Sequence, residues 1–223
     1  MSFVVVLGWV AAAISAAVSL PQLIRLMRSG TSAGLSLLMW QLTMCAGAGW
    51  TFHGLLTERP NVWLPNLVLG VCSMLVVRLI ARDRGLPALK VWLLPAVIIT
   101  TLIGIDVVLG ATAYGVATSV PQVIGAGAQL IAIAASRDIR GVSPFYVTLA
   151  TVVQMAWLWW GLLAGDNAIA ISASATLSVV GTTLVWYLLR RIGLIGALGR
   201  DRGSVHAGTG HDVASGELAD SSV

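Results

Sequence analysis

Residues 91–135 read VWLLPAVIITTLIGIDVVLGATAYGVATSVPQVIGAGAQLIAIAA, with Asp106 as the one charged residue among them. A helix that crosses a membrane needs about 20 apolar residues, so a stretch of about 45 is too long for a single span. We therefore predict two spans, 91–109 and 111–135, which are joined by a tight turn at Gly110. This division fixes the number of spans, and with it the side of the membrane on which each connecting loop lies.

Apolar runs of spanning length fill most of the remaining chain. Of its 223 residues, 57% are hydrophobic and 10% are charged, whereas soluble domains carry about 25% charged residues. No positively charged segment precedes the first run, so we expect no cleaved signal peptide. The composition predicts an all-α integral membrane protein with seven transmembrane helices. The other five spans are expected at 3–27, 36–56, 62–80, 143–163 and 168–189.

The basic residues lie in alternate breaks between the predicted spans. With seven spans, Arg59 alone lies on one side of the membrane, and the other 12 of the 13 basic residues lie on the opposite side. Cytoplasmic loops carry the excess of Lys and Arg, so we expect the N-terminus outside and the C-terminus in the cytoplasm, in a plasma (inner) membrane. Because these charges punctuate membrane spans, they do not indicate nucleic-acid binding. The twelve residues are Arg25, Arg28, Arg78, Arg82, Arg84, Lys90, Arg137, Arg140, Arg190, Arg191, Arg200 and Arg202.

A shift of 107 residues reveals an internal repeat without gaps. It places the stretch 22–56 over 129–163, and the matches include Trp50 on Trp157 and Gly54 on Gly161. Each copy would hold three helices, and a fourth helix between the copies would give both the same orientation. Two parallel three-helix bundles with a path between them are expected. The predicted parts are a first bundle at 1–82, a linker helix at 83–110, a second bundle at 111–190 and a disordered tail at 191–223.

Several motifs of the repeat carry a resemblance to a known family. They are Ser19-Leu20-Pro21-Gln22-Leu23-Ile24, the loop 29–36, Trp50 with Gly54-Leu55-Leu56, Leu64-Pro65-Asn66, Trp157 with Gly161-Leu162-Leu163, and Gly165-Asp166-Asn167. In these residues, and over roughly residues 3–189, the chain resembles the SWEET sugar transporters and the wider PQ-loop family. The resemblance implies a 3+1+3 helix arrangement, alternating access between the bundles, and prolines that act as hinges. Pro21, Gln22, Pro121 and Gln129 are the expected hinge or gate residues.

The second copy departs from that pattern at two places. Pro121 and Gln122 look like the second Pro-Gln pair, but the gapless shift places Ala128 and Gln129 opposite Pro21 and Gln22. Which pair occupies the second Pro-Gln position stays open. In addition, Ser172 and Ala173 stand opposite Pro65 and Asn66, so one half lacks the amide.

Four positions are expected at one depth in the membrane. Trp50 lies roughly 9 Å below the outer end of its helix and Asn66 roughly 6 Å below the start of the next one, at about 1.5 Å per residue. Trp157 and Ala173 repeat these depths in the second copy, and Ser172 could replace part of the missing amide. An indole face offers apolar contact to sugar C–H groups, and an amide pairs with hydroxyls. The resemblance implies that these positions line a sugar pocket.

The predicted spans lack the residue sets that enzymes use. We see no paired carboxylates, no nucleophile with a base, no metal cluster and no phosphate loop, so we expect neither an enzyme nor a cofactor. Cys45 and Cys72 are expected to act as small apolar residues. Among ionisable groups inside spans, Asp106 and His53 are the candidates for proton coupling.

The sequence thus favours a passive carrier of a small neutral solute, a mono- or disaccharide. A proton-coupled amino-acid carrier of the PQ-loop type remains the alternative, and it would need Asp106 or His53 on the transport path. A third reading is a membrane receptor or assembly protein that transports nothing. Membrane lipid is the expected surrounding, and homo-oligomerisation is left open.

Overall fold

The computed structural model of the chain is helical throughout the part that it describes. That part covers residues 2–29, 36–140, 142–196 and 198, with backbone only for residues 16–27 and 29. The predicted tail, 191–223, falls mostly outside it. Within these limits the helices are α1 (Phe3–Ser29), α2 (Leu37–Leu56), α3 (Pro60–Asp83), α4 (Ala88–Ala135), α5 (Pro144–Ala164) and α6 (Asn167–Arg191).

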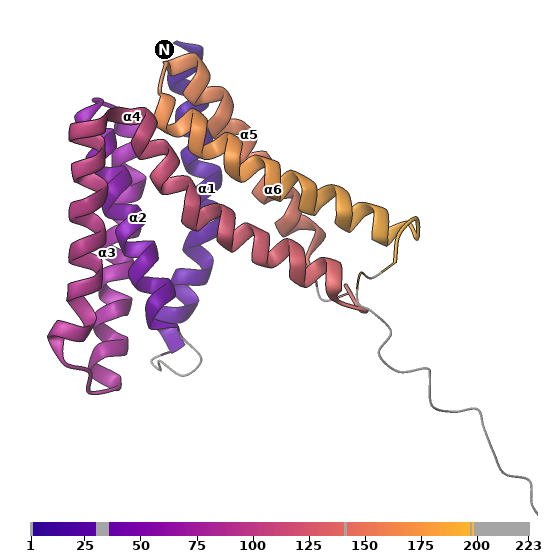
Figure 1. The fold of residues 1–223 in the computed structure, drawn as a ribbon, viewed down its shortest axis with the longest axis horizontal. Coiled ribbons are helices and arrows are strands. Elements are labelled where there is room, and N and C mark those ends of the chain that lie inside the picture. The colour runs from indigo at the N-terminus through magenta and orange to yellow at the C-terminus, as the bar shows by residue number, and fades with distance from the viewer. Residues whose placement is uncertain (1, 30–35, 141, 197, 199–223) are drawn as a thin grey trace, which may run out of the picture.

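The element α4 contains a break at Gly110. Its backbone has φ 82° and ψ 175° there, while helical hydrogen bonding continues on both sides. A residue with a side chain rarely adopts this conformation, which is why glycine occupies the break. The chain turns sharply at the top of Figure 1, where α4 changes direction. The element α4 therefore consists of two helical segments that meet at a kink at the predicted residue.

Helices of the two predicted copies begin at positions that are 107 residues apart. α2 begins at Leu37 and α5 at Pro144. The side chains of Ser36 and Ser143 cap these helices, because each accepts a hydrogen bond from the backbone amide three residues further along the chain. The next helices begin at Pro60 and Asn167. The turns before them close with equivalent hydrogen bonds, Arg59 N to Gly54 O at 2.7 Å and Asp166 N to Gly161 O at 2.8 Å. The repeat thus extends to the local hydrogen bonds of the structure.

The helices converge at one end of the molecule and diverge toward the other (Figure 1). We call the first the tight-turn end; it holds the turns at residues 57–59, 110 and 165–166. The opposite end, which we call the basic end, holds the connections 84–87 and 136–143 and the end of α6 at Arg191. In each copy the third helix lies between the other two: α3 contacts α1 and α2, and α6 contacts α4 and α5. The copies are joined by contacts of α1 with α5 and by the contacts of Trp50 and His53 in α2 with Tyr114 in the second part of α4.

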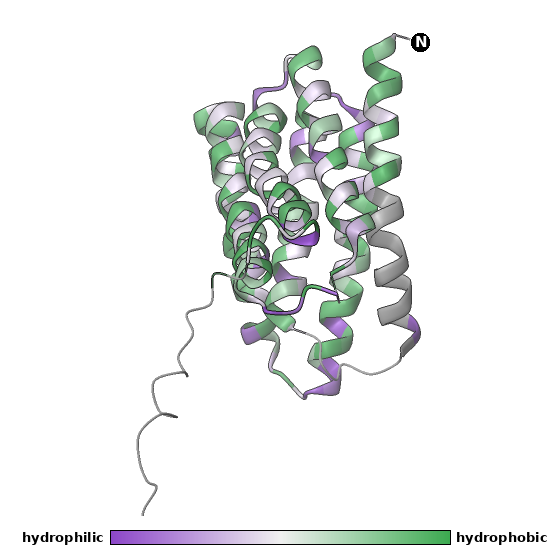
Figure 2. Cartoon of the chain, turned by 90° about the vertical axis from the view of Figure 1, so that its right-hand side faces the viewer, coloured by the Kyte–Doolittle hydropathy of each residue, from purple (hydrophilic) through white to green (hydrophobic). Residues whose placement is uncertain are grey.

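Hydrophobic residues predominate along the helices (Figure 2). Four of the described helices, α3, α4, α5 and α6, are long and apolar enough to cross a membrane. Large side chains such as Val108, Phe145 and Leu162 are more than 60% exposed. Such a surface is stable in lipid, where no polar outer face is needed. The chain is a multi-pass helical membrane protein.

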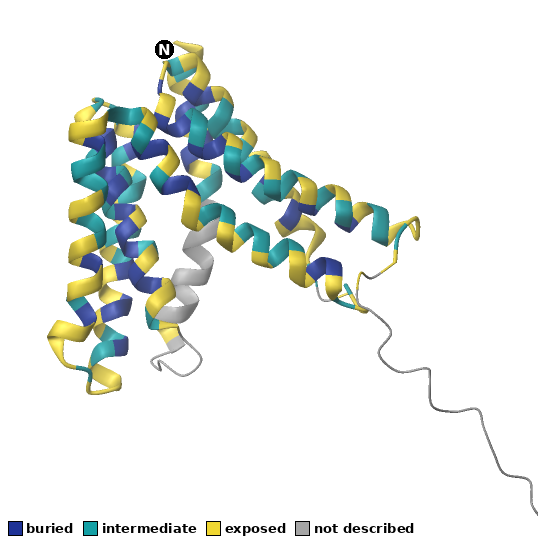
Figure 3. Ribbon diagram, in the orientation of Figure 1, coloured by how far each residue is buried: buried dark blue, intermediate teal, exposed yellow. Residues whose placement is uncertain are grey.

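The first part of α4 packs against α2 and α3. A cluster of Trp40, Val76, Val77, Ile80 and Val91 is at most 5% exposed. Beside it, the buried amide of Gln41 donates to the carbonyl of Val91 over 2.7 Å. In Figure 3 buried residues also gather where the helices meet near the tight-turn end. These contacts fix the first part of α4 to the first copy.

Replacing Gly110 with alanine should destabilise the protein through its backbone. The substitution Gly110→Ala forces a side chain into a positive-φ conformation at a cost of about 1–3 kcal/mol. Gly104→Ala is the matched control, because both glycines lie in α4 and neither would place a Cβ within 4 Å of another atom. Thermal unfolding in detergent should show a lower midpoint for Gly110→Ala and an unchanged or higher one for Gly104→Ala. Equal midpoints would contradict the role of Gly110 as the break.

Candidate functional site

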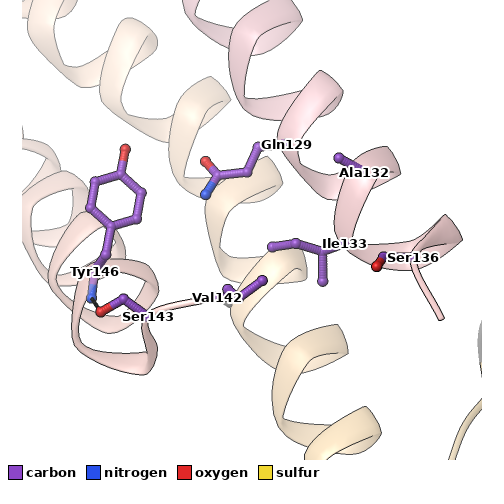
Figure 4. Close-up of a pocket in the computed structure, with 7 residues that line it drawn as sticks. All are labelled: Gln129, Ala132, Ile133, Ser136, Val142, Ser143 and Tyr146. Atoms are coloured by element: carbon purple, nitrogen blue, oxygen red, sulfur yellow. Dashed lines mark hydrogen bonds between the residues drawn. The ribbon is translucent and has the colours of Figure 1, made fainter. Parts of the chain in front are cut away.

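Two hollows lie between the helices toward the basic end. One, of about 420 Å³, is lined by Gln129, Ala132, Ile133, Ser136, Val142, Ser143 and Tyr146 (Figure 4). The other, of about 350 Å³, is lined by Ser15, Gly125, Ala126, Gln129, Tyr146, Ala150, Val153, Gln154 and Val180. They share Gln129 and Tyr146, so we treat them as one cavity. Both volumes fall in the range of about 300–1,000 Å³ that small-molecule sites occupy.

The cavity wall is largely apolar, carries a few polar side chains and holds no charged residue among the described ones. It offers the amides of Gln129 and Gln154 and the hydroxyls of Ser15 and Tyr146, among apolar and small residues. None of the described residues that line it is Asp, Glu, Lys, Arg or His. Amides and hydroxyls both donate and accept hydrogen bonds, as the hydroxyls of a polyol require. Ser15 belongs to α1 and the other lining residues follow Gly110, so both copies contribute to the wall.

The tight-turn end is closed by a buried histidine between two carboxylates. The side chain of His53, in α2, is fully buried. Its Nδ1 lies 2.9 Å from Oδ2 of Asp106 in α4, and its Nε2 lies 3.3 Å from both carboxylate oxygens of Asp166, which caps α6. Both aspartates are at most 6% exposed. Asp166 also accepts a 3.0 Å hydrogen bond from the amide of Ile169. The imidazole therefore joins α2 to the first part of α4 and to the start of α6.

Aromatic rings pack around this histidine. The ring of Tyr114 stacks on His53 with centroids 5.0 Å apart, and Trp50 meets both rings edge-on. Tyr114 comes just after the Gly110 break and is 1% exposed. Its hydroxyl is buried and has no hydrogen-bond partner among the described residues. The imidazole thus has one face covered by an aromatic ring.

A second contact joins the two copies at the same end. The guanidinium of Arg59 lies 5.9 Å from the ring centroid of Trp160 and donates a 3.0 Å hydrogen bond to the carbonyl of Ala164. Arg59 and Asp166 precede α3 and α6 at positions 107 residues apart, and His53 and Trp160 are 107 apart as well. Each residue that precedes a third helix therefore reaches the second helix of the other copy. We call these contacts the Asp166 brace and the Arg59 brace.

Both predicted pocket tryptophans pack at the inner side of this closure. Trp50 and Trp157 are half-buried against a cluster of Val62, Trp160 and Ile169. The indole nitrogen of Trp157 also donates a 2.9 Å hydrogen bond to the hydroxyl of Ser15, which lines the cavity. The structure thus brings the two tryptophans to one cluster and connects Trp157 to the cavity wall.

The other predicted pocket residues lie within their own copies. Asn66 donates a 2.8 Å hydrogen bond to the carbonyl of Val62, one turn earlier in α3. Ser172 and Ala173 are buried, and the hydroxyl of Ser172 accepts a 2.9 Å hydrogen bond from Gln122. None of these three predicted residues lines the cavity in this conformation.

The predicted gate residues fall in different surroundings. The backbones of Pro21 and Gln22 continue α1, and their side chains lie outside the described part of the structure. Pro121 lies exposed within α4, whose backbone stays helical there. Gln122 bonds to α6, whereas Gln129 lines the cavity. Both candidates for the second Gln position therefore face neighbouring helices or the cavity.

Several residues of the closure and the cavity went unnoticed as functional candidates, among them Asp166, Tyr114, Tyr146 and Gln154. Asp166 was visible as part of Gly165-Asp166-Asn167, and its equivalence to Arg59 under the 107-residue shift could have marked it. Tyr114, Tyr146 and Gln154 carried no signal, because a polar residue in an apolar run does not show which neighbour it faces. The described residues hold no group of three or more His, Cys, Asp or Glu side chains that could bind a metal ion.

Comparison with known proteins concerns the first copy. Residues 3–63 match the PQ loop repeat family. The match covers α1, α2 and the first residues of α3. No curated protein matches the sequence.

Removing the imidazole should destabilise the fold. In His53→Ala the carboxylates of Asp106 and Asp166 stay buried without their partner, which costs about 3–5 kcal/mol at neutral pH. Adding Asp106→Asn and Asp166→Asn should recover part of that loss, because neutral amides replace the unpaired charges and Asn remains a good helix N-cap. Thermal unfolding in detergent measures both effects. A His53→Ala protein as stable as the parent would contradict the role of His53 in the closure.

Proposed function

We propose that the chain is a passive carrier of a small neutral polar solute, a mono- or disaccharide, and that it works by alternating access. The observation that carries the proposal is the uncharged cavity near the basic end, whose largely apolar wall carries amides and hydroxyls, combined with the closure at the tight-turn end. In this reading a solute enters the cavity from the basic end, and the braces keep the other end shut. The reverse conformation would open the braces and close the basic end.

The repeat supports this mechanism. The bundles 1–82 and 111–190 would rock against each other, and the segment 83–110 would link them. The break at Gly110 supports a reading of α4 as two spans and therefore of the chain as seven. The PQ-loop match over residues 3–63 and the resemblance to SWEET transporters favour the same 3+1+3 arrangement.

The charge distribution supports one orientation. Among the residues that the structure describes, the basic ones other than Arg59 lie at the basic end or in segments that adjoin it, and such residues favour the cytoplasmic side. We infer that the basic end faces the cytoplasm and that the N-terminus lies outside, in the plasma (inner) membrane. The conformation described here would then be the inward-open one.

The predicted pocket residues fit the roof of this cavity. Trp157 lies next to it through Ser15, and Trp50 packs against the same apolar cluster. Asn66 and the Ser172-Ala173 pair would contact the solute when the bundles approach each other at the basic end. A proton-coupled amino-acid carrier is less well supported, because His53 and Asp106 are absent from the cavity wall.

Uptake by proteoliposomes tests the proposal. Labelled glucose and sucrose should enter with saturable kinetics, and an imposed pH gradient should not drive them against their own gradient. Gln154→Leu and Trp157→Ala should each lower the rate by about tenfold, the effect of losing about 1.4 kcal/mol of binding. Asn66→Ala should lower it as well.

The matched control is Thr182→Val. The hydroxyl of Thr182 is exposed and bonds only to the carbonyl of Ser178 in its own helix, so this change should leave uptake unaltered. Absence of sugar uptake by protein that is folded, as judged by its thermal transition, would overturn the sugar assignment. Accumulation driven by the pH gradient would overturn the passive mechanism.

A further inference from the structure

The Asp106–His53–Asp166 cluster spans the boundary that must separate when the tight-turn end opens. His53 and Asp106 lie in segments that pack together, α2 and the first part of α4. Asp166 belongs to the other copy, at the start of α6. In a rocking motion His53 would keep Asp106 and lose Asp166.

The closed cluster requires two bridging protons. Each of the two N···O contacts of the imidazole needs one hydrogen, supplied either by the ring or by a carboxyl group. A neutral imidazole carries a single N–H, so it cannot satisfy both aspartates when both are ionised. The cluster therefore holds an imidazolium between two carboxylates, or a neutral imidazole with one protonated carboxyl. Both arrangements bind the same number of protons.

When Asp166 moves away from His53, the cluster no longer needs its second bridging proton. When Asp166 leaves and water enters, the N–H toward Asp106 keeps its carboxylate partner, whereas the second proton loses the contact that held it. The carboxylate of Asp166 stays ionised in water. Opening therefore releases one proton to the compartment that the tight-turn end faces.

Other ionisable groups near the cluster differ in kind. Tyr114 stacks on His53 from α4, and Arg59 of the neighbouring brace approaches Trp160 of α5. Glu58 is exposed in the turn before α3. In α1 the side chains of residues 3–15 include no ionisable group, and the exposed Arg28 lies in the last turn of that helix.

The cluster is also separated from the cavity. None of its three members lines the cavity, and the apolar cluster of Val62, Trp160 and Ile169 packs at the same end with Trp50 and Trp157. A proton that leaves the cluster on opening and returns on closing would do both on the tight-turn side. Such exchange moves no net charge across the membrane, and it is compatible with passive transport.

We propose that His53, Asp106 and Asp166 form a proton-binding lock, which is closed by a proton taken from the tight-turn side and opens when that proton is released. The proposal rests on the alternating access proposed above. Because the closed form binds one more proton than the open form, acid favours closure and base favours opening. The equilibrium constant for opening should rise by up to about tenfold per pH unit above the range in which the free imidazole titrates.

Cysteine labelling tests the lock without any solute. In a Cys45→Ala, Cys72→Ala background, Val62→Cys places a thiol in the closure, where Val62 is 1% exposed, and Leu56→Cys places one at the same end, where Leu56 is 54% exposed. The rates of reaction with a membrane-impermeant maleimide are measured in nanodiscs from about pH 5 to about pH 8, the range in which histidine titrates. The ratio of the two rates removes the pH dependence of the thiol itself.

The ratio should rise with pH in the parent and become flat in Asp166→Asn and in His53→Gln. Arg59→Gln is the matched control, because it weakens the equivalent brace, which has no group that titrates in this range. It should raise the ratio at every pH and keep the slope. A flat ratio in the parent, a slope retained in Asp166→Asn, or a slope lost in Arg59→Gln would overturn the lock. Sugar uptake decides the carrier proposal separately, because the labelling needs no sugar.

Discussion

The imidazole of His53 between Asp106 and Asp166 is the interaction on which the arrangement of the two copies depends. Burying three ionisable groups in a membrane protein is costly unless each has a partner. Here each group has one, but only while the start of α6 lies against α2. The complete cluster therefore stabilises the closed end, whereas a partly broken cluster leaves a buried ionisable group without its partner. A gate with two states requires such a difference.

The repeat explains why the closure has two parts with different chemistry. Arg59 and Asp166 occupy equivalent positions, and each reaches the second helix of the other copy. Arg59 meets the ring of Trp160, whereas Asp166 meets the imidazole of His53. The repeat places the two braces at equivalent positions, but their side chains differ. The Asp166 brace therefore depends on bound protons, and the Arg59 brace does not.

Much of the helix order could be predicted from the sequence, and the contacts between copies could not. Apolar runs and the glycine at position 110 predicted helix limits within a few residues, because spanning length and backbone conformation are local constraints. The 107-residue shift predicted that Ser36 and Ser143 would stand in equivalent places. The approach of Asp166 to His53 depends on how two distant segments dock, and no local pattern encodes that. In the same way, the sequence marked Trp50 as a candidate pocket residue, but it did not show that Trp50 contacts Tyr114 in a distant segment.

The central claim is that the two ends open in alternation. Pulsed electron paramagnetic resonance between spin labels measures both ends in a cysteine-free background. Labels at Leu56 and Leu163, equivalent exposed positions in α2 and α5, report on the tight-turn end, and labels at Arg82 and Leu188 report on the basic end. The account predicts that saturating sugar lengthens one distance while it shortens the other. Two distances that change in the same direction, or that stay fixed while sugar is transported, would contradict it.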